Sequence, residues 1–207
     1  MNTNPLEQVI QGGVLTPTIA SILSTPHVVT EPTSQWTREL ALRVGGKGVF
    51  PLKLGTIQAN LVGGPYRNKP EGFYGIKMAA EINADCVISI PTEDYSVPAT
   101  SRLIAGLYCG IAMAQQQVPI WVGCFGGIGR TGLYFAALAK VMARYQKLMK
   151  HKVTIDPIRF TREQYLSHAV ETKEQIQYIA DLNVDAVAEW AAAINGYKPP
   201  WWKRFFR

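Results

Sequence analysis

A glycine-rich loop between an apolar strand and a long helix constrains the fold of this chain more than any other feature. Residues 118–122 are apolar and predict a short buried strand, and residues 131–150 carry apolar side chains at helical spacing. In the glycine-rich loop (residues 123–130), Cys124 and Arg130 enclose five residues, three of which are glycine. A strand, a loop and a helix in this order predict an α/β unit with the loop at the helix N-terminus.

The glycine-rich loop has the composition of an oxyanion site. Backbone N–H groups at a helix N-terminus lack intrahelical partners, and the positive end of the helix dipole favours an anion such as phosphate. The guanidinium of Arg130 can clamp two oxygens of that anion. We therefore expect the following residues to bind a phosphate: Phe125, Gly126, Gly127, Ile128, Gly129 and Arg130.

Cys124 lies in the same electrostatic field. Amides at a helix N-terminus and a nearby arginine favour the thiolate of a cysteine, which is its nucleophilic form. A thiolate held against a phosphate predicts phosphoryl transfer, in which Cys124 attacks phosphorus while Arg130 and the loop amides stabilise the equatorial oxygens. Thr131 would donate a hydrogen bond to the sulfur when it leaves.

A second segment supplies an acid for such a reaction. The apolar residues up to Pro91 predict another strand, and Asp94 follows it. Since ligands gather at the carboxyl ends of parallel strands, Asp94 and Cys124 are expected at one edge of the sheet. Asp94 would protonate the leaving oxygen. Glu93 is an alternative acid, and a helix N-cap or turn is the structural alternative for Asp94.

The loop also fits a competing motif. Residues 127–132 match the dinucleotide-binding pattern GxGxxG, with Asp156 downstream as that pattern requires. The motif lies past the middle of the chain and is followed mainly by helices, which leaves too few strands for a second half-sheet. The phosphate-binding interpretation is therefore favoured over a Rossmann fold.

Together, these motifs resemble the cysteine-dependent protein tyrosine and dual-specificity phosphatases. The shared residues are the Cys-x5-Arg-Thr-Gly signature that begins at Cys124 and the Pro-Thr-Glu-Asp segment that ends at Asp94, about thirty residues upstream. The resemblance covers roughly residues 54–150. It implies that Cys124 is the nucleophile, Arg130 the phosphate clamp and Asp94 the general acid.

Two further positions bear on this resemblance. Residues 169–175 are similar to a downstream segment of the family, in which Gln175 would orient the hydrolytic water. Gly123 stands where the family usually has a histidine that supports the acidity of the nucleophile, so we expect reduced tuning of Cys124 rather than lost chemistry.

The resemblance implies a phosphomonoester hydrolase of the tyrosine or dual-specificity type that acts through a cysteinyl-phosphate intermediate. One alternative is a phosphatase of the same superfamily that acts on a phosphoinositide, a nucleotide or an RNA 5′ phosphate. Another is a weakly active phosphate-binding module. The depth of the pocket would separate phosphotyrosine from phosphoserine, and residues 66–69 are expected to line one of its walls.

The fold predicted from the remaining patterns is α/β: a central, mostly parallel sheet flanked by helices, phosphatase-like by resemblance, with a helical C-terminal part. Strands are expected over 54–62, up to Pro91 and over 118–122, and helices over 70–84, 103–111 and 131–150. From 160 to 195 the chain is expected to be largely helical, with a break near Asn183.

Three regions are expected along the chain. Residues 1–50, rich in Thr, Ser, Pro and Gly, predict an irregular N-terminal arm or cap, and residues 51–197 a phosphatase-like catalytic domain. Residues 198–207 combine four aromatic side chains with four cations, which suits contact with an anionic surface. Docking of these aromatic side chains onto the domain is the alternative.

Composition indicates an ordinary globular protein. The 207 residues suggest one folded domain, and no stretch is apolar enough to span a bilayer. The three cysteines show no paired framework and no metal-ligand spacing, so a reducing compartment, the cytoplasm, is expected, with Cys86 and Cys109 as buried structural residues. The net charge of +6 favours anionic partners, here a phosphorylated protein or another phosphomonoester, and no cofactor or metal is expected.

Overall fold

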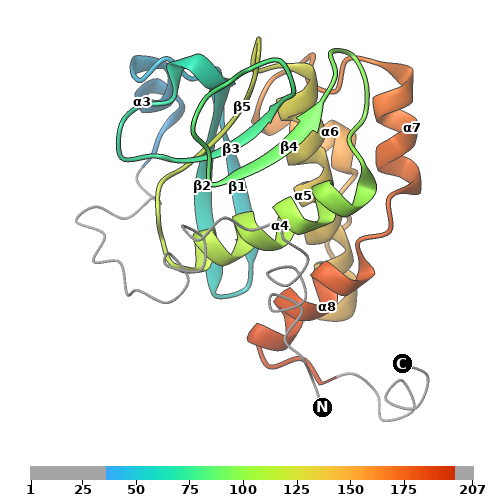
Figure 1. The fold of residues 1–207 in the computed structure, drawn as a ribbon. Helices are drawn as coiled ribbons and strands as arrows, with labels where there is room; N and C mark the ends of the chain where they lie inside the picture. Colours follow the sequence, from blue (N-terminus) through green and yellow to red (C-terminus); the bar gives the residue numbers. More distant parts are fainter. Residues whose placement is uncertain (1–35, 199–207) are drawn as a thin grey trace.

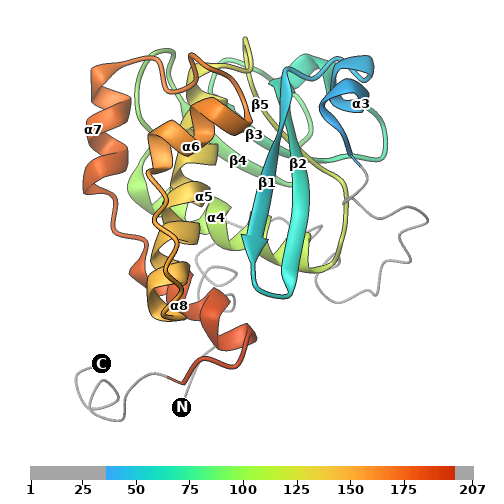
Figure 2. The same cartoon turned by 180° about the vertical axis from the view of Figure 1, so that it is seen from behind.

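A computed structural model describes residues 36–198, which form one five-stranded sheet with helices packed around it (Figures 1 and 2). The strand order is β1-β2-β5-β3-β4. Only β1 and β2 pair in antiparallel fashion, and β2–β5, β5–β3 and β3–β4 are parallel pairs. The strands are β1 (Gly48–Leu54), β2 (Ile57–Pro65), β3 (Tyr74–Ala79), β4 (Ile88–Thr92) and β5 (Ile120–Cys124). The predicted α/β fold with a mostly parallel sheet is confirmed.

Strand β5 lies at the centre of the sheet, and every residue of it is buried. A strand covered on both faces has no solvent side, which is why its sequence is an apolar run without alternation. Helices α4 (Thr100–Gln115) and α5 (Gly129–Leu148) pack against the sheet and against each other, joined by the Tyr134 hydroxyl, which donates to the Gly106 carbonyl at 2.8 Å. Phe135 of α5 stacks on Phe50 of β1, with ring centroids 4.8 Å apart.

The C-terminal part is helical, as predicted. It consists of α6 (Pro157–Gln164), α7 (Lys173–Asp181) and α8 (Asp185–Ile194), and the break between the last two lies at the predicted Asn183. In both views these helices gather around α5, on the side of the sheet away from α3 (Arg38–Arg43) (Figures 1 and 2). Among residues 36–198, no helix is long and apolar enough to cross a membrane.

The prediction of a helix over residues 70–84 is wrong. Tyr74–Ala79 form strand β3 instead, which inserts between β5 and β4. Apolar residues in this segment imitate helical spacing, but parallel pairing of Tyr74 with Ile120 and of Ile76 with Ile88 gives the backbone its hydrogen-bond partners in the sheet. The expected strand over 54–62 is likewise shifted, because a turn at Gly55 separates β1 from β2.

The structure describes only part of the predicted N-terminal arm and almost none of the predicted tail. Within the expected irregular arm, residues 36–50 contain α3 and the beginning of β1, so this part has regular structure. The rest of that arm and almost all of the basic aromatic tail, 199–207, lie outside the described residues, so the predicted contact of the tail with an anionic surface stays a prediction. Cys109 is buried in α4 as expected, whereas Cys86 is half-buried and precedes β4 rather than lying in a strand.

Candidate active site

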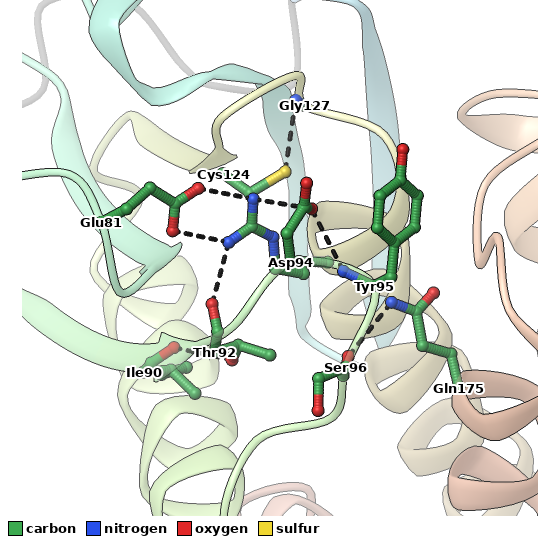
Figure 3. A network of polar contacts seen from close by, with 10 residues as sticks. Glu81, Ile90, Thr92, Asp94, Tyr95, Ser96, Cys124, Gly127 and Gln175 are labelled. Atoms are coloured by element: carbon green, nitrogen blue, oxygen red, sulfur yellow. Dashed lines mark hydrogen bonds and ion pairs between the residues drawn. The ribbon is translucent and has the colours of Figure 1, made fainter.

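The glycine-rich loop connects the carboxyl end of β5 to the first turn of α5, as the sequence predicted. Cys124 is the last residue of the strand and is only 3% exposed. The backbone N–H of Gly127 turns back and donates to the Cys124 sulfur at 3.2 Å (Figure 3). The N-cap residue of helix α5, Ile128, makes no side-chain cap hydrogen bond to the amides of the first turn.

The end of strand β2 packs directly against this loop, which explains the glycine before the cysteine. A Cβ atom at Gly123 would lie 2.7 Å from the Gly64 carbonyl oxygen and 2.8 Å from the Tyr66 Cα, both of which are backbone atoms. Gly127 has a φ of 72°, and a Cβ there would meet the same stretch of β2. The histidine that the family usually carries before its cysteine therefore has no room in this chain.

Arg130 is the most heavily contacted side chain of the site. It is 2% exposed, and its two terminal nitrogens donate to both carboxylate oxygens of Glu81 at 2.8 and 2.7 Å. One nitrogen also donates to the Thr92 carbonyl at 2.8 Å, and the other lies 3.0 Å from Asp94 Oδ1. Burial alone would lower the pKa of Arg130, but the hydrogen bonds of Glu81 and the nearby charges of Cys124 and Asp94 outweigh it, so the pKa is raised.

Glu81 is a site residue that the sequence analysis did not identify. It lies just beyond the carboxyl end of β3, and its hydrogen bonds with Arg130 lower its pKa from the usual range. The signal is the same as for Asp94, an acid following a strand, but the apolar spacing of this segment imitates a helix. Recognition of β3 would have placed Glu81 at the edge of the sheet where the site forms.

Asp94 lies in the connection between β4 and α4, which we call the Asp94 loop (residues 93–99). Its side chain is 62% exposed, and one carboxylate oxygen accepts a hydrogen bond from the Tyr95 N–H at 3.1 Å in addition to its contact with Arg130 (Figure 3). Asp94 therefore reaches the same guanidinium that closes the glycine-rich loop. A pocket opens at this point, lined by Ala80, Glu81, Glu93, Asp94 and Phe125.

Phe125 forms an aromatic face at this pocket. Its side chain is 53% exposed, and the Arg67 guanidinium lies 4.8 Å from the ring centroid. Of the residues expected to line the wall, Arg67 thus reaches the pocket through Phe125. Tyr66 instead belongs to the core, where its hydroxyl donates to the Asp85 carbonyl at 2.7 Å.

Thr131 and Gln175 are both buried, but they are held differently. Within the described part of the chain, the Thr131 hydroxyl has no hydrogen-bond partner. Both ends of the Gln175 amide are engaged: its oxygen accepts the Glu171 N–H at 2.9 Å, and its nitrogen donates to the Ser96 carbonyl at 3.1 Å. The structure thus brings Cys124, Arg130 and Asp94 together and connects Gln175 to the Asp94 loop.

Asp156 and the metal-ligating residue types bear on two other kinds of site, a dinucleotide-binding site and a metal site. Asp156, the acid of the competing dinucleotide motif, caps helix α6 by accepting the Arg159 N–H at 2.8 Å. Across residues 36–198, no cluster of three or more His, Cys, Asp or Glu side chains is arranged to hold a metal ion.

Comparison with known proteins identifies the region that contains the site. Residues 92–185 match the family model of the protein-tyrosine phosphatases. The uncharacterized protein MJ0215 of Methanocaldococcus jannaschii is 28% identical over 92 residues, which make up 44% of this chain and 52% of that protein. The chain thus spans about half the length of this curated relative.

Two solved structures are also similar. Tk-PTP in the active form is 18% identical with a TM-score of 0.42, and the match covers 54% of this chain and 78% of that one. A mutant form of Tk-PTP is 18% identical with a TM-score of 0.43, covering 57% of this chain and 80% of that one. The family match confirms the resemblance inferred from the signature residues: residues 92–185 are similar to the protein-tyrosine phosphatases.

Proposed function

We propose that this protein is a phosphomonoester hydrolase of the tyrosine or dual-specificity type that acts through a cysteinyl-phosphate intermediate. One observation carries the proposal: the buried Arg130 guanidinium lies between the loop that holds Cys124 and the carboxylate of Asp94, 3.0 Å away. A phosphate bound to Arg130 would thus face a nucleophile on one side and an acid on the other.

In the first step, the phosphate takes the place of Asp94 on Arg130. The Cys124 sulfur forms a bond to phosphorus while the bond to the leaving oxygen breaks, and Asp94 donates its proton to that oxygen. Arg130 and the amides of the glycine-rich loop stabilise the charge on the equatorial oxygens. Glu81 keeps Arg130 in place through its paired hydrogen bonds.

In the second step, water attacks phosphorus and gives a proton to the Asp94 carboxylate while the sulfur–phosphorus bond breaks, which releases inorganic phosphate and restores both the thiolate and the acid. Thr131 is suited to assist here, because its buried hydroxyl has a proton to donate and no partner among the described residues. A hydrogen bond from this hydroxyl would stabilise the departing sulfur.

The mouth of the pocket supports an aryl phosphate as substrate. The exposed ring of Phe125 can pack against a second aromatic ring, such as that of a phosphotyrosine side chain. All three cysteines are free thiols, which fits a reducing compartment such as the cytoplasm. Because the Phe125 ring suits the ring of a phosphotyrosine, a phosphorylated protein is the substrate class that we propose.

The test is release of p-nitrophenol from p-nitrophenyl phosphate in EDTA, with Cys124→Ser as the matched control. Turnover that survives EDTA and is lost in the serine variant is expected. Folded protein that binds vanadate but shows no Cys124-dependent turnover would reduce the loop to a phosphate-binding site. Phosphotyrosine, phosphoserine and phosphothreonine peptides, a phosphoinositide, a nucleotide and an RNA 5′ phosphate then rank the substrates.

A further inference from the structure

We propose that Gln175 is a positioning residue, which holds the Asp94 loop over Arg130 through its hydrogen bond to the Ser96 carbonyl. The inference rests on the proposed function, because it assigns Asp94 the acid role. It differs from the water-orienting role expected for Gln175, since it makes the first chemical step depend on this residue.

The orientation of the Gln175 amide is fixed by the helix that carries it. Gln175 is the third residue of α7 and completes a capping box with Thr172, whose hydroxyl accepts the Gln175 N–H at 3.0 Å. The Gln175 oxygen accepts the N–H of Glu171 at 2.9 Å, so the nitrogen must occupy the other end of the amide. A flipped amide would set its NH2 group against an N–H donor and its oxygen against a carbonyl.

The nitrogen then reaches the Asp94 loop. It donates to the Ser96 carbonyl at 3.1 Å, and Gln175 is completely buried, so water does not compete for this contact (Figure 3). At the end of the same connection, the Tyr178 hydroxyl of α7 donates to the Thr100 hydroxyl at 3.3 Å. Helix α7 therefore holds the segment at two points.

Ser96 is coupled closely to Asp94. The Ser96 N–H donates to the Glu93 carbonyl at 3.2 Å, which closes a turn around Asp94 and Tyr95. Tyr95 adopts a left-handed φ of 58°, and its N–H donates to the Asp94 carboxylate. Since the turn is this tight, fixing the Ser96 carbonyl fixes where the Asp94 side chain begins.

We call the hydrogen bond from Gln175 to the Ser96 carbonyl the tether. A single substitution can remove the tether and keep the capping box of α7. In Gln175→Glu, a carboxylate oxygen still accepts the Glu171 N–H, because glutamate is an ordinary third residue of a capping box. While it is ionised, the second oxygen faces the Ser96 carbonyl and repels it, which breaks the Gln175–Ser96 hydrogen bond. Because burial favours the neutral acid, which could donate to that carbonyl, the uncharged Gln175→Met is the companion variant. Gln177→Glu makes the same chemical change at an exposed position of the same helix. It removes the hydrogen bonds of Gln177 to Asp181, which lies in the same helix and away from the Asp94 loop, and serves as the control.

The decisive measurement is kcat/KM for aryl phosphates whose leaving phenols have increasing pKa values. kcat/KM reports the steps up to cleavage of the phosphorus–oxygen bond, where only poor leaving groups need the acid. We expect Gln175→Glu to lower kcat/KM about 10-fold for phenyl phosphate and only about 2-fold for p-nitrophenyl phosphate. Gln177→Glu should leave both values unchanged, and the uncharged Gln175→Met should reproduce the selective loss.

Other results would overturn the proposal. A fall in kcat with kcat/KM unchanged, together with a burst of phenol, would assign Gln175 to the hydrolytic water. An equal loss for every leaving group would mean a general structural defect.

Amide hydrogen exchange of residues 93–99 in the Cys124→Ser background gives a second reading that does not need activity. Gln175→Glu should accelerate it, and unchanged exchange would overturn the tether itself. Wild-type protein without Cys124-dependent turnover would instead overturn the proposed function, together with the catalytic meaning of the tether.

Discussion

The two walls of the pocket are held in opposite ways. The glycine-rich loop is a backbone structure, continuous with β5 and α5, and Cys124 within it is buried. The Asp94 loop presents a mostly exposed carboxylate, and the contacts that hold it come from side chains distant in sequence, namely Arg130 and Gln175. The difference indicates that the wall proposed to bind the phosphate is formed in advance, whereas the wall that carries Asp94 depends on a few replaceable contacts.

Arg130 ends the glycine-rich loop and contacts Asp94, so it connects the two walls and its substitution should have the largest effect. Arg130→Lys keeps the charge, but an ammonium group cannot make the paired hydrogen bonds with Glu81 and still reach the Thr92 carbonyl. We expect kcat/KM for p-nitrophenyl phosphate to fall about 10³-fold.

The matched control for this change is Arg144→Lys. Arg144 lies in the same helix and pairs with Asp185 through its Nε at 2.6 Å, away from the loop. It should change kcat/KM by less than about 2-fold, since an exposed ion pair contributes little. A loss below about 10-fold in Arg130→Lys would mean that the loop amides bind the phosphate almost alone.

Asp94→Asn should break the exposed wall without disturbing the buried one. Asparagine keeps the size of the side chain but has no acidic proton, so we expect kcat/KM to fall about 10²-fold for phenyl phosphate and less than about 10-fold for p-nitrophenyl phosphate. Vanadate affinity should change little, because the loop that binds it is intact. If Glu93→Gln rather than Asp94→Asn gives the leaving-group-dependent loss, the acid is Glu93.

Gly123→Ala should destabilise the buried wall, because it disturbs the packing of the glycine-rich loop against β2. The added Cβ would meet backbone atoms of Gly64 and Tyr66 that cannot rotate away, so we expect a loss of about 2 kcal/mol in the free energy of unfolding in urea. Gly126→Ala is the control in the same loop, because a Cβ there has its nearest neighbour, an Ile128 side-chain atom, 3.9 Å away. Equal losses in the two variants would contradict the close approach of β2.

The same contrast explains how much the sequence could predict. The strand, loop and helix around Cys124 follow from local patterns, and so does the helical part after residue 156. Strand β3 does not follow from local patterns, because its hydrogen-bond partners lie in β4 and β5. Since Glu81 follows this strand, its position at the site could not be predicted either. The tether of Gln175 to Ser96 spans 79 positions and has no local signature.

Gly123 shows how little a family resemblance explains about a single position. The sequence marks it as a departure, but the reason is the backbone of Gly64 and Tyr66 across the sheet, which only the strand register reveals. The residue is therefore a packing requirement of this chain, and the reduced tuning of Cys124 that was expected from it stays a prediction.

The smallest expected effect concerns Glu81, whose paired hydrogen bonds hold Arg130, the side chain that connects the two walls. Its pKa is lowered by the hydrogen bonds from Arg130, whereas an unfolded chain has a glutamate pKa of about 4.3. Its stabilising contribution is thus fully present above that value and is lost as the pH falls through the lower folded-state pKa. Because the Glu81 side chain is 42% exposed, we expect less than about 1 kcal/mol at neutral pH.

Urea unfolding of the wild type and Glu81→Gln at pH 7, 5 and 3.5 measures this contribution. The difference in the free energy of unfolding should be largest at pH 7 and should shrink at pH 3.5, where the carboxylate begins to take up protons. Glu93→Gln, at the rim of the same pocket, provides the control for losing one exposed charge. A difference that stays the same at all three pH values would show that Glu81 stabilises the site by its shape rather than by its charge, and the two walls would then be joined by packing alone.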